Sequence, residues 1–277
     1  MIHTPKRRVT EPPINGLHEL ARDFMMQYKV IHALIIREIH TRFGRENLGF
    51  LWVIGEPILF CGGVAILWTA IRPAKEHGLA MTAMVVTGYV PLTMWRHCLG
   101  RALKAYESNG SLFYHRQVTP FDIIVARSFL EIIGTIMAGM IVTVGAIGLG
   151  YMAPPVDYGL LVLGLVYQCV FCFGCALVAA ALSEVSELTE KIVGIFSYLA
   201  LPVTGAFIMV SWLPLKYQWI LLLSPMANNV EMIRGGQLGP EIHVQYDLFY
   251  DTWITGLLVI VGIILTSKVR KFIEING

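Results

Sequence analysis

Long apolar runs separated by short polar segments dominate this chain. A helix needs about 20 mostly apolar residues to cross a bilayer, and six runs meet or approach that length. They are Leu48–Ile71, Leu79–Leu99, Phe121–Met152, Tyr158–Leu182, Ile192–Leu213 and Phe249–Ser267. The third run is longer than needed and is expected to project into the cytoplasm, and the last is the weakest because Asp251 lies near its start. The pattern predicts an all-α membrane protein with six transmembrane helices.

The composition agrees with this pattern. Hydrophobic residues make up 56% of the chain and charged residues 14%, whereas soluble domains carry about 25% charged residues. The net charge of +2 is too small for a nucleic-acid-binding surface, so we expect no nucleic-acid partner. The five cysteines all lie within apolar runs and therefore say little about the redox compartment.

The distribution of basic residues predicts the orientation. Cytoplasmic loops of membrane proteins carry an excess of Lys and Arg. If the N-terminus is cytoplasmic, most of the 21 basic residues fall on the inner side, including Lys6–Arg8, Arg116 and Lys268–Lys271. Six spans then place both termini in the cytoplasm.

The segment before the first span has helical amphipathic spacing. Its apolar residues recur at steps of three and four: Leu17, Ala21, Phe24, Tyr28, Ile31, Ile35 and Ile39. The helix is too charged to span, so we expect it along the cytoplasmic interface. It is either a plain anchor or a gate helix that also contacts a cytoplasmic partner through its end, at Arg37, Glu38, Arg42 and Phe43.

The inner loop Tyr106–Asp122 contains a second candidate contact. Asn109-Gly110 indicates a turn and Pro120 prevents a helix from continuing. Between them lies Ser111–Gln117, in which Leu112, Phe113 and Tyr114 are expected to be exposed, followed by Arg116. Adjacent large apolar groups in a short loop need a cover, which is either the bilayer surface or, as we favour, a partner protein.

The outer stretch Trp212–Gly239 predicts two short helices. Pro214 and Pro225 bracket an apolar piece, Tyr217–Leu223, that is too short to cross the membrane. A second helix, Met226–Arg234, is expected to end at Gly235-Gly236, with Glu231 and Arg234 on one side. The pair predicts a re-entrant hairpin; the alternative is a surface loop with aromatic residues such as Tyr217 and Trp219 in the interfacial belt.

Signatures of catalysis are missing from the sequence. There is no GxxxxGK[ST] loop, no HExxH and no GxSxG. Cys169, Cys172 and Cys175 repeat every three residues, but the fourth cysteine of an iron–sulfur motif is absent from the run. We expect no catalytic site, metal or cofactor in this chain, which favours a permease, channel or receptor.

Charged and aromatic residues within the spans mark a candidate substrate path. Ionisable groups in a membrane are functional candidates by default, and Glu56, Arg96 and Arg101 lie in or near the first two spans. Arg127 and Glu131 have the spacing of an ion pair along one helix. Aromatic residues that could face sugar rings are Trp52, Trp68, Tyr89, Trp95, Tyr198 and Trp212. The alternatives are structural ion pairs and the interfacial aromatic belt.

Residues 37–57, REIHTRFGRENLGFLWVIGEP, resemble the signature of ABC-2 type polysaccharide exporter permeases, most closely the capsular-polysaccharide permeases of Gram-negative bacteria. The inner loop, with Asn109, Leu112, Phe113 and Pro120, resembles the N-x-x-L-F…P segment of the family. The outer stretch SPMANNVEMIRGG resembles its NP…VE..R segment, with Ser224 in place of the usual Asn.

The resemblance implies an inner-membrane protein divided into a cytoplasmic segment, residues 1–46, and an ABC-2 transmembrane domain, residues 47–277. It implies a homodimer with two separate ABC ATPase subunits, which hold the ATP and Mg²⁺. The coupling helix would be Ser111–Gln117, the outer gate the re-entrant pair, and the path the dimer interface lined by spans one, two and five. A periplasmic adaptor, an outer-membrane exporter and a lipid-linked polysaccharide substrate are further implied partners.

Two other interpretations remain open. The same fold could export O-antigen, teichoic acid, another lipid-linked glycan, or a small lipid or drug. A channel or secondary transporter would need no ATPase, but it predicts inverted repeats and broken helices near the midplane, and we find no convincing repeat between the two halves of the sequence.

Overall fold

The computed structural model describes residues 16–43, 49–71, 75–76, 79–114 and 118–276. Within them the α-helices are α1 (Gly16–Phe43), α2 (Gly49–Ile71), α3 (Met81–Ala102), α4 (Pro120–Gly148), α5 (Tyr158–Val185), α6 (Leu188–Leu199), α7 (Leu215–Leu222), α8 (Pro225–Leu238) and α9 (Leu248–Asn276). The 3₁₀ turns are η1 (Glu107–Tyr114), η2 (Leu201–Val203), η3 (Val210–Trp212) and η4 (Gly239–Glu241). The strands β1 (Lys75–Glu76) and β2 (Leu79–Ala80) form a small antiparallel hairpin.

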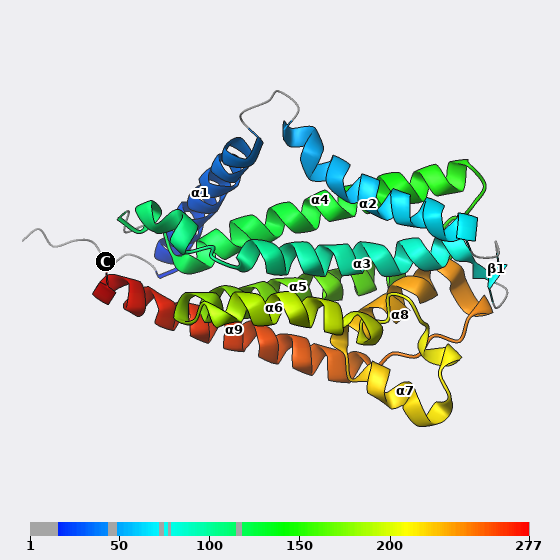
Figure 1. Ribbon diagram of the computed structural model, residues 1–277. Coiled ribbons are helices and arrows are strands. Elements are labelled where there is room, and N and C mark those ends of the chain that lie inside the picture. Colours follow the sequence, from blue (N-terminus) through cyan, green and yellow to red (C-terminus); the bar gives the residue numbers. More distant parts are fainter. Residues whose placement is uncertain (1–15, 44–48, 72–74, 77–78, 115–117, 277) are drawn as a thin grey trace, which may run out of the picture.

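The long helices form an elongated bundle (Figure 1). α5 lies at its centre and packs against α3, α8 and α9, while α2 packs against α3 and α4. α1, η1 and the end of α9 lie at one end, and the β-hairpin, α7 and α8 lie toward the other. The main core is formed by small and medium apolar side chains of α3, α4 and α5, such as Cys98, Ile124, Leu177 and Ala180.

Local sequence signals set where α4 and α5 begin. Thr119 caps α4: its hydroxyl accepts from the backbone N–H of Asp122 at 3.3 Å, and the Asp122 carboxylate accepts from the backbone N–H of Thr119 at 2.9 Å. Pro120 fills the first helical position, where no N–H is needed. Asp157 caps α5 by accepting from the Leu160 N–H at 3.0 Å.

The helix pattern agrees largely with the apolar runs. Among the described residues, three helices are long and apolar enough to cross a membrane: Pro120–Gly148, Tyr158–Val185 and Leu248–Val269. α2 and α3 coincide closely with the first two predicted spans. The N-terminal amphipathic stripe lies on α1, which is a single helix to Phe43.

The predicted fifth span, Ile192–Leu213, is wrong as a continuous helix. α6 ends at Leu199, which gives it a length of about 18 Å at 1.5 Å per residue. A 3₁₀ turn containing Pro202 follows, and Gly205 has φ +73. Proline lacks the backbone donor that a helix needs, and a positive φ lies outside helical geometry. The apolar run therefore continues as non-helical backbone after α6.

The second outer helix is longer than the sequence predicted. α8 does not end at Gly235-Gly236 but runs to Leu238, and Gly239, with φ +72, ends it. A Cβ at Gly236 would collide with the backbone of Leu161 in α5. The two glycines therefore permit close packing of α8 on α5, instead of ending the helix.

α8 runs alongside the first half of α5. Near its start, Asn229 donates to the Gln168 side chain at 3.1 Å, and Gln168 lies about 15 Å along α5 from its first residue. Near its end, Gly236 contacts Leu161. Gln168 in turn donates to the Pro91 carbonyl of α3 at 3.1 Å, so these buried amides join α3, α5 and α8.

Candidate functional site

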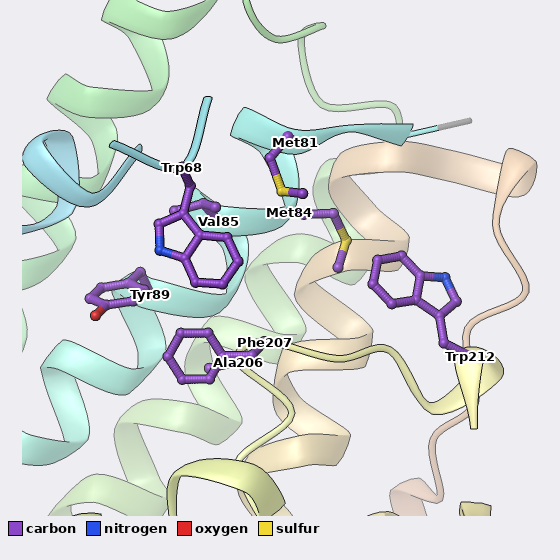
Figure 2. A pocket seen from close by; sticks show the side chains of 8 residues that line it. All are labelled: Trp68, Met81, Met84, Val85, Tyr89, Ala206, Phe207 and Trp212. Atoms are coloured by element: carbon purple, nitrogen blue, oxygen red, sulfur yellow. The ribbon is translucent and has the colours of Figure 1, made fainter. Parts of the chain in front are cut away.

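Three residues of the predicted path meet in one aromatic pocket (Figure 2). Trp68 of α2, Tyr89 of α3 and Trp212 of η3 line it together with Phe207. The Phe207 ring centroid lies 6.0 Å from that of Trp68 and 5.7 Å from that of Tyr89. The cavity volume is about 20 Å³, which is room for about one water molecule. Phe207 stacks on Trp68 and meets Tyr89 edge-on, and the space that remains is too small for a sugar ring.

A second group of path residues lies where α3 meets α6. The Arg96 guanidinium lies 4.8 Å from the centroid of the Tyr198 ring, a cation–π distance. Trp95 is only 4% exposed and packs edge-on against Phe196 at 6.4 Å. Tyr198 is 61% exposed, so α6 presents an aromatic face outward while Trp95 is part of the core.

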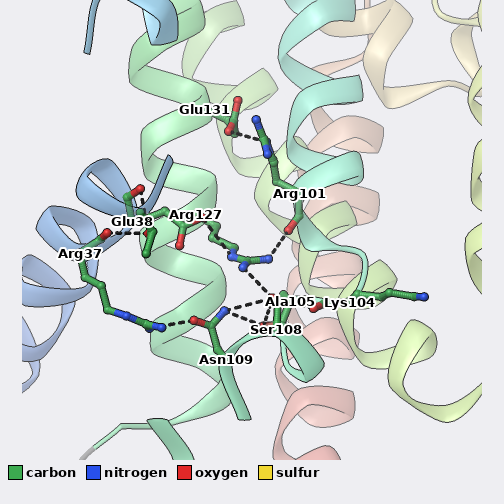
Figure 3. A network of polar contacts seen from close by, with 10 residues as sticks. Arg37, Glu38, Arg101, Lys104, Ala105, Ser108, Asn109, Arg127 and Glu131 are labelled. Carbon is green, nitrogen blue, oxygen red and sulfur yellow. Dashed lines mark hydrogen bonds and ion pairs between the residues drawn. The ribbon is translucent and has the colours of Figure 1, made fainter. Parts of the chain in front are cut away.

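The candidates that the sequence predicts on the cytoplasmic side converge in what we call the inner network, formed by Arg37, Glu38, Arg101, Asn109 and Arg127 (Figure 3). Arg37 of α1 donates to the Asn109 side chain of η1 at 2.8 Å. Arg127 of α4 lies 3.4 Å from the Glu38 carboxylate and donates to the Arg101 carbonyl at 3.0 Å. The network therefore connects α1, the end of α3, η1 and α4.

Arg127 also reaches η1 directly. Its Nη2 donates to the Ser108 hydroxyl at 2.8 Å. Glu131, which the sequence paired with Arg127 along α4, lies 3.3 Å from the Arg101 guanidinium and 3.5 Å from the His97 ring. The charges at this end of α4 therefore bridge helices.

The turn between α3 and η1 is held by α5 and α6. Lys104 has φ +53, a left-handed conformation that is uncommon outside glycine. Its backbone N–H donates to the Ser183 hydroxyl at 3.3 Å, and its Nζ lies 3.2 Å from the Glu190 carboxylate. The hydrogen bond to Glu190 raises the pKa of Lys104. η1 is thus tied to α6 as well as to α1 and α4.

Two residues of the predicted exposed trio on the inner loop, Leu112 and Phe113, fold back further than expected. A 3₁₀ helix covers Glu107–Tyr114 with a kink at Asn109 (φ −120, ψ 18), and residues 115–117 of the predicted coupling helix lie outside the described residues. Leu112 and Phe113 are half-buried against the main core, and the Phe113 ring lies 6.3 Å from that of Tyr106. The bend at Asn109 directs these side chains inward, whereas Ser111 is exposed.

Tyr106 lies beneath η1 and packs against Phe113. Its side chain is 1% exposed, and burial raises its pKa to about 12. The phenol is therefore neutral at physiological pH and provides a ring for Phe113 to pack on.

The outer candidates divide into exposed and buried pairs. Tyr217 and Trp219 on α7 are 49% and 60% exposed. Glu231 and Arg234 on α8 are fully buried and lie 3.8 Å apart, which confirms that they share one side of the helix.

Several predicted site residues cannot be placed in this way. The side chains of Arg42, Phe43, Trp52, Glu56 and Tyr114 lie outside the described residues, as does all of Arg116. Conversely, the sequence reasoning missed Phe207, and it recognised Asn109 as a turn residue but not as the partner of Arg37. Pro202 and Gly205 were the signals for Phe207, because both interrupt the apolar run that contains it.

The described part of the chain contains no set of side chains suited to bind a metal ion. No group of three or more His, Cys, Asp or Glu side chains there is arranged to hold a metal ion. All five cysteines are free thiols, and Cys172 is fully buried in the core.

Long apolar helices, an amphipathic N-terminal helix and a polar network at one end define a polytopic helical membrane protein. Residues 29–238 match the family model of the ABC-2 type transporter. The chain therefore belongs to the ABC-2 type transporter family.

The relatives are similar over nearly their whole length. The chain is 34% identical to the capsule polysaccharide export inner-membrane protein CtrC of Neisseria meningitidis serogroup B, over 94% of this chain and 99% of the relative. It is 35% identical to the capsule polysaccharide export inner-membrane protein BexB of Haemophilus influenzae, over 90% and 94%. Identity to the polysialic acid transport protein KpsM of Escherichia coli is 24%, over 87% and 94%.

Proposed function

We propose that this chain is the membrane-spanning permease of an ATP-driven exporter that carries a lipid-linked capsular polysaccharide across the bacterial inner membrane. The observation that carries the proposal is the 34–35% identity to two capsule polysaccharide export inner-membrane proteins over at least 90% of the chain. Membership of the ABC-2 family supports an export machine whose ATPase is a separate subunit.

The proposed membrane arrangement has six spans. α2, α3, α4, α5 and α9 each cross the bilayer, and α6 crosses together with the non-helical residues that follow it. α1 lies on the cytoplasmic surface, and both termini are cytoplasmic. Residues 1–46 form the cytoplasmic segment and residues 47–277 the transmembrane domain.

α7 and α8 form the proposed re-entrant outer gate. The contact between Asn229 and Gln168 supports a hairpin that enters about half of a 30 Å hydrocarbon core from the outer side. Glu231 and Arg234 lie within the hairpin, while Tyr217 and Trp219 lie on its exposed helix.

The proposed coupling element is η1 with the residues that follow it. Ser111, Leu112, Phe113, Tyr114 and Arg116 contact the ATPase, and Arg37, Glu38, Arg42 and Phe43 on α1 form the gate helix beside them. The inner network supports this proposal because displacement of η1 reaches α1 through Arg37 and α4 through Arg127. ATP binding then moves whole helices, as in rigid-body transport cycles.

A homodimer is proposed, with the substrate path between the two copies. Its proposed lining is Trp52, Glu56, Trp68, Tyr89, Trp95, Arg96, Arg101, Tyr198 and Trp212. In this structure Trp68, Tyr89 and Trp212 line the closed aromatic pocket and Trp95 is buried, so these four would line the path only once it opens. The exposed Phe196 and Tyr198 on α6 support an aromatic face at this interface. Two ATPases bind from the cytoplasm, and a periplasmic adaptor and an outer-membrane exporter receive the polymer.

Deletion of the gene in its own bacterium tests the cargo. We expect surface capsule to disappear and lipid-linked polymer to accumulate inside the cell, with restoration by the plasmid-borne chain. O-antigen measured in the same cells serves as the control. Normal capsule with lost O-antigen, or no change in either, would contradict the proposal.

A further inference from the structure

The non-helical segment after α6 is unusual because its backbone needs partners. Residues 204–212, which we call the outer wall, follow the end of α6 and include Gly205 at φ +73. Backbone at membrane depth that is not helical persists only where protein or water satisfies its polar groups. Much of the outer wall is nevertheless buried: Thr204, Ala206, Met209 and Val210 are all 3% exposed or less, although Ile208 is exposed.

Arg234 supplies the donors for three of its carbonyls. Nη1 donates to the Gly205 carbonyl at 2.7 Å and to the Ile208 carbonyl at 3.1 Å, and Nη2 donates to the Ala206 carbonyl at 2.7 Å. The side chain is fully buried, so no water competes for these bonds. A planar guanidinium can reach several acceptors at once, which a lysine ammonium does less well.

Glu231 supplies the complementary acceptor. Its Oε1 accepts from the Val210 N–H at 3.1 Å, and its Oε2 accepts from the Gln245 N–H at 3.3 Å. Glu231 and Arg234 lie one turn apart on α8 and pair at 3.8 Å. One face of α8 thus binds the outer wall and also the segment that leads to α9.

The other side of the outer wall rests on α3. A Cβ at Gly88 would collide with the Ala206 carbonyl and would lie 2.9 Å from Arg234 Nη2. Glycine is therefore required at this point for the wall to pack directly on the α3 backbone. This contact places Phe207 against Trp68 and Tyr89, and Trp212 at the rim of the same aromatic pocket (Figure 2).

α6 differs from the outer wall that follows it in how far its residues are buried. None of its residues is buried, whereas five of the nine wall residues are buried. The joint between them is η2, Leu201–Val203, which carries Pro202. α6 is tied to the cytoplasmic end through Glu190 and Lys104, while the wall is tied to α8.

We propose that Arg234 and Glu231 are positioning residues that bind the outer wall to α8, so that the wall moves with the α7–α8 hairpin and not with α6. The pair thereby sets the position of the Phe207 and Trp212 side chains. That these side chains limit the export path rests on the proposed function; the attachment of the wall to α8 does not.

Hydrogen–deuterium exchange of the purified permease in nanodiscs tests the attachment without cargo or ATPase. In Arg234→Met we expect amides of residues 205–212 to exchange about tenfold to a hundredfold faster, because three carbonyls lose their donor in a buried site. In Arg234→Lys the exchange rate of these amides should lie between the rates in Arg234→Met and in the native chain. The exchange rates of amides in the middle of α4 should stay the same in both variants.

Lys216→Met is the matched control, since it removes an exposed positive charge from the same hairpin. Gly88→Ala provides an independent variant that keeps both charged residues and displaces the wall from α3. It should also accelerate exchange in residues 205–212, because the wall then loses its contact with α3. Unchanged exchange in this segment in folded Arg234→Met, or in Arg234→Lys if Arg234→Met does not fold, would overturn the attachment.

Export assays test whether the Phe207 and Trp212 side chains limit the export path. Arg234→Lys in the assembled transporter should hydrolyse ATP at the native rate but export less polymer, whereas Lys216→Met should export normally. If Arg234→Lys loosens the wall yet exports normally, the wall does not limit the path, although its attachment to α8 stands. If the chain transports another cargo, the exchange result is unaffected, so the two proposals fail separately.

Discussion

At the scale of single residues, Phe113 illustrates how a surface group can have two roles. Its ring packs on Tyr106 inside the protein and is half-buried there, while the neighbouring Ser111 is exposed. The proposed ATPase contact therefore uses the remaining exposed part of the ring and the residues beside it. A polar substitution acts on the contact and on the packing beneath it.

Replacing Phe113 by Asp should uncouple ATP hydrolysis from export, because a carboxylate has no apolar contact to make with either Tyr106 or the ATPase. Export should fall by about tenfold or more, as expected from the loss of roughly 1.4 kcal/mol or more in a partly buried contact. Membrane insertion should persist. Phe113→Leu is the control, since it keeps an apolar group and should retain most export. Normal substrate-stimulated ATPase activity and export in Phe113→Asp would refute the coupling assignment.

Arg127 is the residue that joins the largest number of elements in the inner network. It contacts Glu38 on α1, Ser108 on η1 and the carbonyl of Arg101. Its ion pair with Glu38 is partly buried, whereas its hydrogen bonds to Ser108 and to the Arg101 carbonyl are exposed. Exposed ion pairs are worth only about 0–1 kcal/mol.

In Arg127→Met we expect the assembled complex to hydrolyse ATP while polymer export falls several-fold, because η1 is no longer connected to α4. Lys191→Met removes an exposed charge from α6 and should leave export unchanged. Export by Arg127→Met at the native level, in the presence of normal amounts of protein, would show that force does not pass through this residue.

At the scale of elements, close packing of helices depends on small residues. Gly236 and Gly164 bring α8 and α5 together, and Gly262 brings α9 onto Leu177 of α5. Small residues at helix interfaces are the usual means of close approach in membrane bundles. α8 owes its depth along α5 to these contacts.

Gly236→Ala should therefore destabilise the protein by about 1–3 kcal/mol, since its Cβ would meet the Leu161 backbone, which cannot move aside easily. Thermal unfolding in detergent measures the effect as a lowered midpoint. Gly145→Ala is the matched control: it lies within α4 with open space around its Cβ, and alanine favours a helix by up to about 1 kcal/mol. Equal midpoints for the two variants would exclude tight α5–α8 packing at Gly236.

The elements that the sequence predicted well are those with one dominant signal. α5 and α9 are long apolar runs, and α4 also has a capping box at Thr119. The errors occurred where two signals compete. Hydropathy extended the fifth span through Pro202 and Gly205, and Gly235-Gly236 suggested a helix end because packing against α5 is invisible in one sequence.

The candidate site was harder to predict for the same reason. Glu231 and Arg234 were recognised as a pair, but their backbone partners at residues 205–210 are distant in sequence. Likewise the sequence paired Arg127 only along its own helix and did not predict its contacts with α1, η1 and the end of α3. Long-range polar contacts depend on the tertiary arrangement, which periodicity does not encode.

At the scale of the whole molecule, the two ends of the bundle have different chemistry. The end with α1 and η1 holds the inner network of arginines and carboxylates (Figure 3). The opposite end holds the closed aromatic pocket (Figure 2). It also holds the buried Glu231–Arg234 pair. In the proposed cycle, energy enters at the first end, and the second end opens for the polymer.

The central claim is that this chain moves a lipid-linked polysaccharide only with energy supplied by a separate ATPase. The direct measurement is translocation of that polymer in proteoliposomes that contain the permease alone, the permease with its ATPase, or the ATPase with Phe113→Asp permease. We predict ATP-dependent translocation only in the second preparation. Translocation by the permease alone, or equal translocation by the Phe113→Asp complex, would contradict the account.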